Sequence, residues 1–376
     1  MEDPMRTNPT RFVHLNRILT LGIVNLALVS PALSQTTSLP LSTIEAATVG
    51  GTQQSQISSY VDHWSQRATG ADSQQAARAQ TKLIEPLINS RVSISFRRAY
   101  SDAMGPLFDQ LEADNNIGST LLALRIAGEL GTSKSSKLIL SSLDSDDAGV
   151  QIFAAGRAGR TFRTTAANGP ALAANDLNLL IAKLDALASS TTDESLIGVC
   201  IQALGHGCSL PSDDFLAARA ECLRAMCDAA SKQLDASSSD LESRVRLSML
   251  GSGAATNSLL QIGEDSNHEA VKAAVALGAD MISIALSAVL SDSLPPVNNR
   301  ALHVTLVRSG ESLLYFALRE HAELERRSIG NVQQTAFADL LEAGEDRDFR
   351  NAAALLLGAG SPIVTDFGFA DDRFVN

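Results

Sequence analysis

The chain has 376 residues, of which 45% are hydrophobic and only 4% aromatic, so it can build the core of one large domain or two ordinary ones from small aliphatic side chains. Its 30 basic and 42 acidic residues give a net charge of -12. This charge argues against a nucleic-acid partner or an anionic membrane surface, because both are recognised through a positively charged surface.

The first 34 residues have the order of a secretory signal peptide. Three arginines precede an uncharged apolar stretch, Ile18–Val29, and the small residues Ala32 and Ser34 follow it. The stretch of about 12 residues is too short to span a bilayer as a helix. We therefore predict cleavage after Ser34, export to the periplasm or the exterior, and no permanent membrane span; the alternative is that the segment is kept as an anchor.

Composition divides the remaining chain into four segments. Residues 35–58 are rich in Ser, Thr and Gln and are expected to form a tether. Residues 59–99 are expected to form leading helices that cap the core, with Trp64 among them. The main helical array spans 100–360, and the tail, 361–376, is expected to cap the other end or to engage a partner.

A pattern recurs along the array: an apolar helix, an acidic turn, and an Ala-rich second helix that closes on Gly. The clearest copies run through the acidic turns at 263–267, 344–348 and 144–147. The closing glycines lie on average about 38 residues apart, the length of a helix pair with its turns. They are Gly131, Gly159, Gly205, Gly251, Gly278, Gly310 and Gly358.

Each part of the pattern has a physical role. Asp, Ser or Asn before the second helix caps its free amide groups. Alanine keeps the helix thin, and the closing glycine suits a left-handed residue at a helix end. One helix pair cannot bury its apolar face alone, so pairs must stack. The sequence therefore predicts an all-α fold, an α-solenoid of about five to seven helix pairs.

The chain resembles the HEAT-like repeat family, including the short bacterial form first associated with phycobilin lyases. The resemblance covers roughly residues 100–360. It rests on the acidic turns, on the closing Ala-x-x-Leu-Gly type of sequence, and on an apolar-basic pair that opens the second helix: Val271-Lys272, Phe349-Arg350 and Val245-Arg246. It implies an armadillo-type α-solenoid in which turn residues form a ladder along the stack.

All four cysteines, Cys200, Cys208, Cys222 and Cys227, lie within one short segment. If the chain turns back at about 207–212, Cys200 and Cys222 lie opposite each other, and we predict a disulfide between them in an oxidising compartment. A zinc site that includes His206 is the alternative, but the spacing of these cysteines is not that of zinc sites.

No metal site or cofactor is predicted. The histidines His63, His206, His268, His303 and His321 are scattered along the sequence and are interpreted as surface or helix-end residues. The acidic segment 144–149 resembles the start of a calcium loop, but the fifth and twelfth ligand positions would hold Ala148 and Ala155. Its carboxylates are therefore interpreted as helix caps.

Two groups of arginines stand out from the acidic background. Arg157, Arg160 and Arg163 follow one another at three-residue spacing and are the candidate binding residues for a carboxylate, a sulfate or an acidic peptide. The alternative is that they only offset the negative end of a helix. The second group near the start of the array is Arg91, Arg97 and Arg98.

The zinc-protease, serine-hydrolase, P-loop and dinucleotide-binding motifs do not occur in a suitable context. We therefore expect a non-catalytic, exported scaffold that binds a protein or peptide partner. One alternative is a structural envelope protein that self-associates. The other is a lyase-like enzyme or accessory protein with a small ligand in a groove lined by Arg157, Arg160 or the segment 200–227.

Overall fold

The computed structural model describes residues 38–70, 72–114, 116–235, 240–262, 267–328 and 334–375. Within these ranges the regular secondary structure is entirely helical, which confirms the all-α prediction. The predicted signal peptide, residues 1–34, lies outside the described residues.

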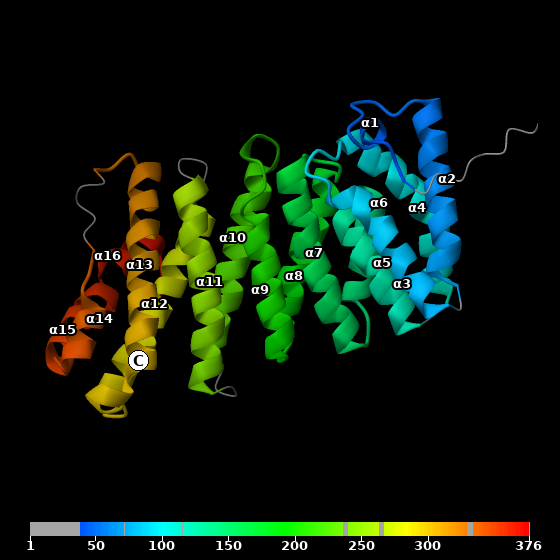
Figure 1. The fold of residues 1–376 in the computed structure, drawn as a ribbon. Coiled ribbons are helices and arrows are strands. Elements are labelled where there is room, and N and C mark those ends of the chain that lie inside the picture. Colours follow the sequence, from blue (N-terminus) through cyan, green and yellow to red (C-terminus); the bar gives the residue numbers. More distant parts are fainter. Residues whose placement is uncertain are drawn as a thin grey trace, which may run out of the picture. The chain divides into compact units, whose positions relative to one another are not determined.

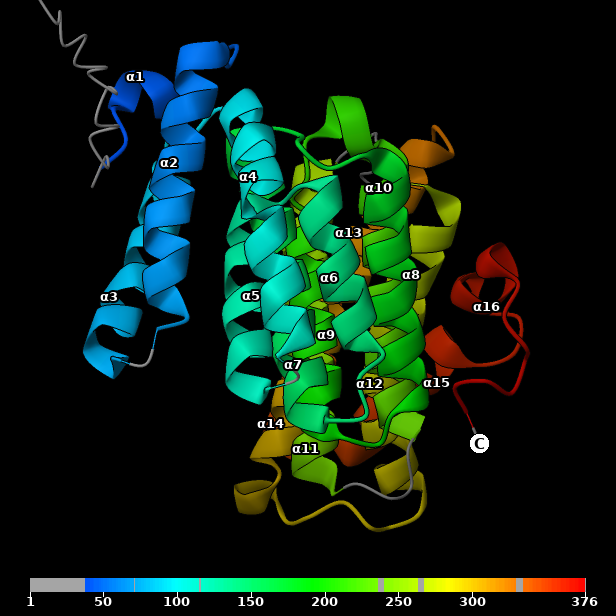
Figure 2. The ribbon, with the colours of Figure 1, turned by 90° about the vertical axis from the view of Figure 1, so that its right-hand side faces the viewer.

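Successive helices alternate between two layers (Figures 1 and 2). The first layer consists of α2 (Gly51–Ala68), α4 (Ile94–Ala113), α6 (Ser133–Leu143), α8 (Ala174–Ser190), α10 (Ser212–Asp235) and α12 (His268–Leu290). The second consists of α3 (Ser73–Ile84), α5 (Ile117–Leu130), α7 (Ala148–Asn168), α9 (Glu194–Gly207), α11 (Leu241–Ile262) and α13 (Ala301–Leu324).

Neighbours within a layer pack side by side. The helices α5, α7, α9, α11 and α13 form one continuous row, and α6, α8, α10 and α12 form the other. At the C-terminal end, α14 (Phe337–Ala343) packs on α13, and α15 (Asp346–Leu357) packs on α12. The core is therefore a slab of apolar side chains between two rows of helices.

The described part of the predicted tether over 35–58, residues 38–58, is packed on the protein instead of forming a loose connection. A short helix, α1 (Leu41–Ile44), precedes α2, and Ile44 and Ile57 are buried. The amide of Ser93 donates a hydrogen bond to the carbonyl of Ile44, and its hydroxyl donates one to that of Ala46. These contacts place the segment beside the start of α4, although its average composition is polar.

Two of the predicted acidic turns lie where the sequence placed them. The turn at 144–147 separates α6 from α7, and the carboxylate of Asp147 accepts a hydrogen bond from the amide of Val150 at 3.0 Å. This is the geometry of an N-cap. Only residues 344–345 separate α14 from α15, and the acidic residues 346–348 form the first turn of α15, where Glu345 makes no side-chain cap hydrogen bond. Residues 263–266 of the remaining turn lie outside the described residues.

The closing glycines differ from the prediction. Only Gly131 ends its helix with a left-handed conformation, at φ 56°. Gly159, Gly205, Gly251, Gly278 and Gly310 lie inside helices, and Gly358 ends α15 in an extended conformation. The helices continue past these glycines, so the pattern that marks a helix end in the sequence marks a close contact between helices instead.

Gly278 of α12 and Gly310 of α13 show this contact most clearly. A Cβ atom added to Gly310 would lie 2.7 Å from the carbonyl oxygen of Gly278, and one added to Gly278 would lie 3.0 Å from that of Gly310. The two backbones therefore touch directly. Small residues at these positions set the separation of α12 and α13, which agrees with a core poor in aromatic side chains.

Helix α12 is long and apolar enough, by length and composition, to cross a membrane. In the structure it packs between α10 and α13, and 67% of its most apolar window is buried in the protein. Its hydrophobicity is accounted for by its position in the core.

The C-terminal segment packs on the array. After α16 (Pro362–Phe367), the chain passes beside α12, where the hydroxyl of Ser283 donates a hydrogen bond to the carbonyl of Phe374 at 2.7 Å. Arg373 pairs with Asp280 at 2.9 Å, and the Phe374 side chain is buried. Of the two roles expected for this segment, the structure therefore supports packing against the array.

Candidate functional site

The three arginines singled out in the sequence lie on α7 but point in two directions. Arg160 pairs with Glu129 of α5 at 2.6 Å. Arg157 is half-buried, and its guanidinium carbon lies 4.7 Å from the centre of the Phe153 ring. Arg163 is exposed. Arg157 and Arg163 line a hollow between α7 and α9, whereas Arg160 lies toward α5.

The surroundings of these arginines carry an excess of positive charge. Burial lowers the pKa of Arg157, and Glu129 opposes this shift. Three other arginines lower the pKa of Arg157 further: Arg160, Arg163 and Arg125. Arg157 nevertheless stays protonated at neutral pH. This local excess contrasts with the net charge of the chain.

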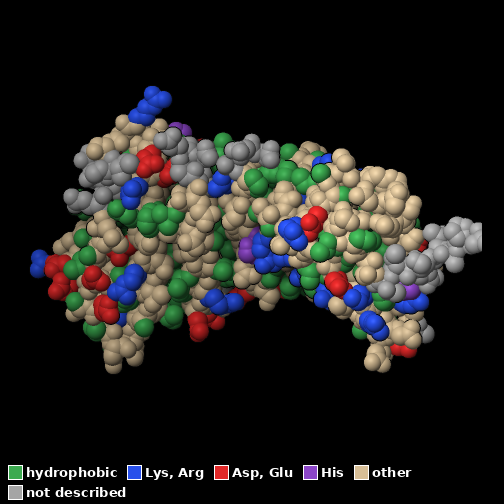
Figure 3. Space-filling model, turned by 45° about the horizontal axis from the view of Figure 1, so that its top comes forward, with side chains coloured by type: hydrophobic (Ala, Val, Ile, Leu, Met, Phe, Trp, Pro, Cys, Tyr) green, Lys and Arg blue, Asp and Glu red, His purple; other side chains and the backbone are tan. Residues whose placement is uncertain are grey.

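Three neighbouring hollows lie along the second layer and share one lining residue. The first, of about 290 Å³, lies between α7 and α9; the others, of about 490 and 740 Å³, lie between α9 and α11. Gln202 lines all three. We call the three hollows together the α7–α11 groove. In Figure 3, Lys and Arg side chains gather near the middle of the visible face, with a histidine beside them.

Small residues create the space for this groove. Gly156 and Gly159 of α7 lie on its floor, as do Gly198 and Gly205 of α9. A Cβ atom on Gly159 would lie 3.0 Å from the Cα of Ala203, so the two helices approach closely there. The missing side chains leave the groove open above this contact.

The groove changes character along its length. Its α7 end is basic, and its middle is lined by apolar side chains that include Val199, Met249 and Leu250. At the far end, Arg246 of α11 lies 3.4 Å from Glu194 of α9, and Glu242 of α11 also lines this hollow. An extended segment with carboxylates at one end and apolar side chains beyond them would be complementary to this surface.

Two titratable groups of the groove have shifted pKa values. Burial lowers the pKa of His206, and Arg163 lowers it further, so its imidazole is neutral at pH 7. Burial raises the pKa of the neighbouring Cys208 thiol to about 11. A protonated thiol is a poor nucleophile, so burial makes Cys208 unreactive.

The four cysteines are all buried free thiols, so the predicted disulfide between Cys200 and Cys222 is not formed in the structure. Cys222 lies against Gly207 at the end of α9, well away from Cys200 along that helix. The backbone of Phe215 is non-helical inside α10, so this helix is kinked before it reaches Cys222. Burial also raises the pKa of Cys200, to about 12.

The three arginines of the second group do not share one exposed surface. Arg97 is fully buried and donates hydrogen bonds to the carbonyls of Leu130, Asn168 and Gly169, at 3.2 Å and 3.0 Å for the first two. Arg91 pairs with Glu45 at 2.9 Å. Arg97 therefore joins α4 to the C-terminal ends of α5 and α7.

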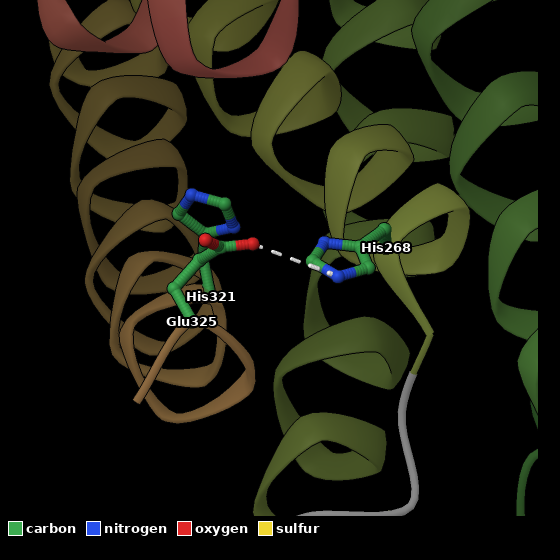
Figure 4. A group of neighbouring side chains, drawn as sticks. All are labelled: His268, His321 and Glu325. Atoms are coloured by element: carbon green, nitrogen blue, oxygen red, sulfur yellow. Dashed lines mark ion pairs between the residues drawn. The ribbon is translucent and has the colours of Figure 1, made fainter. Parts of the chain in front are cut away.

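A cluster that the sequence interpretation missed lies at the junction of α12 and α13 (Figure 4). His268, the first residue of α12, faces His321 and Glu325, which are one helical turn apart at the end of α13. One ligand atom from each residue lies within 4.8 Å of the others. In the sequence, the four-residue spacing of His321 and Glu325 indicates that they lie on one face of a helix. Their approach to His268 could not be predicted, because it depends on how α12 and α13 pack.

No protein-family model matches the chain, and no curated protein is similar to it in sequence. The resemblance to HEAT-like repeats thus rests on the acidic turns and the apolar-basic pairs of the sequence. It remains a prediction.

Proposed function

We propose that the protein is an exported, HEAT-like α-solenoid that acts as a non-catalytic scaffold and binds a protein or peptide partner along the α7–α11 groove. The alternation of helices between two layers, each packed on the next, supports stacked helix pairs. The signal-like order of the first 34 residues supports export. Four buried thiols with raised pKa values are compatible with an oxidising compartment, since they are protected from reaction.

The observation that carries the proposal is the row of three hollows that share Gln202. Arg157 and Arg163 line the hollow at one end, and apolar side chains line the hollows beyond it. Guanidinium groups bind carboxylates through charge-assisted hydrogen bonds, and these bonds gain strength at a half-buried site. The occupant that fits best is an extended segment rich in acidic and apolar residues.

Fluorescence anisotropy tests this assignment. The probe is a fluorescein-labelled peptide of about 12 residues built from Glu, Leu and Ser, and the control peptide carries Lys in place of Glu. We expect saturable binding of the acidic peptide only. The double variant Arg157→Ala/Arg163→Ala should bind it about tenfold or more weakly, since a charge-assisted hydrogen bond contributes about 1.5–3 kcal/mol.

Two further variants separate the groove from general electrostatics. Gln202→Trp leaves the charge unchanged but places a larger side chain at the residue that lines all three hollows. It should abolish binding of the acidic peptide. Arg350→Ala removes an exposed arginine of α15 and should leave the affinity unchanged. Equal binding of the two peptides, or equal effects of Arg157→Ala/Arg163→Ala and Arg350→Ala, would contradict the proposal.

A second candidate function is binding of a small ligand in the same groove. The hollow of about 740 Å³ between α9 and α11 has the volume of a small-molecule site and a mainly apolar lining. A stoichiometric small molecule that copurifies with the protein and is lost in Gln202→Trp would favour this function. This second function does not require binding of the acidic peptide or of the control peptide.

A further inference from the structure

We propose that His268, His321 and Glu325 form a binding site for one divalent transition-metal ion, with Zn²⁺ as the preferred ion, at the junction of α12 and α13. Two imidazole nitrogens and a carboxylate are a ligand set that zinc proteins use. The site is separate from the α7–α11 groove and does not depend on the function proposed for it.

The geometry is close to that of a bound ion. The ligand atoms of the three residues lie within 4.8 Å of one another, and Nε2 of His268 lies 3.7 Å from Oε1 of Glu325. In a tetrahedral zinc site with bonds of about 2.0–2.1 Å, ligand atoms are about 3.4 Å apart. Side-chain rotations of His268 and Glu325, both exposed, would close the remaining distance.

His321 is the anchor of the site and supplies the second, independent observation. Its side chain is about 92% buried, and among the described residues neither ring nitrogen has a hydrogen-bond partner. The ring packs against Phe367, with centres 4.4 Å apart. A buried polar atom without a partner is unfavourable and calls for an unseen water or ion. Figure 4 shows the imidazole beside the Glu325 carboxylate, on the side that faces His268.

The charges around the site favour a cation. A ring nitrogen of His321 can bind a metal ion, because neither nitrogen has a hydrogen-bond partner among the described residues. Glu325 and Asp366 act on it as negative charges, whereas Arg327 and His268 act in the opposite sense. Arg327 pairs more closely with Asp366, at 2.9 Å, than with Glu325, at 3.9 Å. The Glu325 carboxylate is thus left available to the ion.

Bound metal would join the first residue of α12 to the end of α13. Three protein ligands leave at least one position for water or for a group from outside the chain. Nitrogen ligands favour Zn²⁺ over Mg²⁺ and Ca²⁺, which prefer oxygen. We therefore expect Zn²⁺, but not Mg²⁺, to raise the melting temperature of the protein.

Isothermal titration calorimetry of the tag-free full chain with ZnCl2 tests the proposal directly. We expect one ion per chain. Visible absorption of the CoCl2 complex should show the intense d–d bands of a four-coordinate site. His268→Ala and Glu325→Gln change exposed residues, so the fold should persist, and each should weaken zinc binding tenfold or more. The matched control, Glu269→Gln, removes the carboxylate next to His268 and should leave binding unchanged.

The pH dependence adds a second readout. Protons compete with a metal ion for its imidazole ligands, so zinc should bind more weakly at acidic pH than at pH 7.5. The proposal fails if no saturable binding is seen at pH 7.5, or if His268→Ala and Glu325→Gln bind zinc as tightly as the unmodified chain. Binding that is lost only on alkylation of the cysteines would place the ion elsewhere and would also overturn it.

Discussion

Replacing Arg97 with methionine is expected to lower the free energy of unfolding by about 3 kcal/mol. The fully buried guanidinium group donates hydrogen bonds to three backbone carbonyls, which lie at the ends of α5 and α7. Without it, these acceptors lose their partners, and an unsatisfied buried polar group costs about 1–3 kcal/mol. The substitution also removes the free-energy cost of burying a charge, which offsets part of this loss. Burial of the charge is unfavourable, since it lowers the pKa of Arg97 to about 10.

Arg98→Met is the matched control for this variant. Arg98 is the next residue of α4, is exposed, and makes only a long contact of 3.4 Å with the carbonyl of Pro170. Its replacement should change stability by no more than about 0.5 kcal/mol. Urea denaturation followed by circular dichroism measures both variants. Similar midpoints for Arg97→Met and the unmodified protein would show that these helix ends do not depend on Arg97.

Gly310→Ala is expected to destabilise the protein by about 2 kcal/mol or more, although alanine is the better helix former by about 1 kcal/mol. The added methyl group would lie 2.7 Å from the carbonyl oxygen of Gly278 and 3.0 Å from the Cβ of Met281. Both are held in α12, which is buried in the core. The helices must therefore separate, and the contact that joins them is lost.

The same substitution at another glycine, Gly253→Ala, is expected to have the opposite effect on stability. Gly253 lies inside α11, is exposed, and has no atom within 4 Å of the added Cβ position. The propensity gain is therefore not opposed, and we expect stabilisation by about 0.5–1 kcal/mol. Thermal denaturation of the two variants side by side should move the melting temperature in opposite directions. If Gly310→Ala were stabilising too, the α12–α13 contact could not be as close as described.

The features set by local sequence were predictable. Asp147 caps α7 because an acidic side chain before an apolar helix satisfies its free amides, and this needs no knowledge of the tertiary fold. The helical class and the turns at 144–147 and 344–345 follow from the same local preferences, although the acidic residues 346–348 belong to α15. A glycine, in contrast, has two uses that look alike in sequence: Gly131 ends a helix, and Gly310 allows a close contact.

Features that depend on how helices pack were not predictable. The sequence places Arg97 in a basic surface group, but its partners lie at the ends of helices 33 or more residues away. His268 and His321 look scattered, and they meet because α12 and α13 are neighbours. For the candidate binding residues, spacing placed Arg157 and Arg163 correctly on one helix. It could not show that Arg160 faces Glu129 instead.

The most direct test of the proposed scaffold function is photo-crosslinking from Asn257 of α11. A benzophenone amino acid is placed at this exposed position in the groove and, as a control, at Asn178, an exposed position on α8 in the other layer. Both proteins are irradiated in an extract of the source cells, and the crosslinked peptides are mapped by mass spectrometry. We predict an acidic, apolar segment of one partner protein at position 257, displaced by the Glu-rich peptide and absent from position 178. Crosslinks that are the same at both positions, or that resist the peptide, would contradict the account.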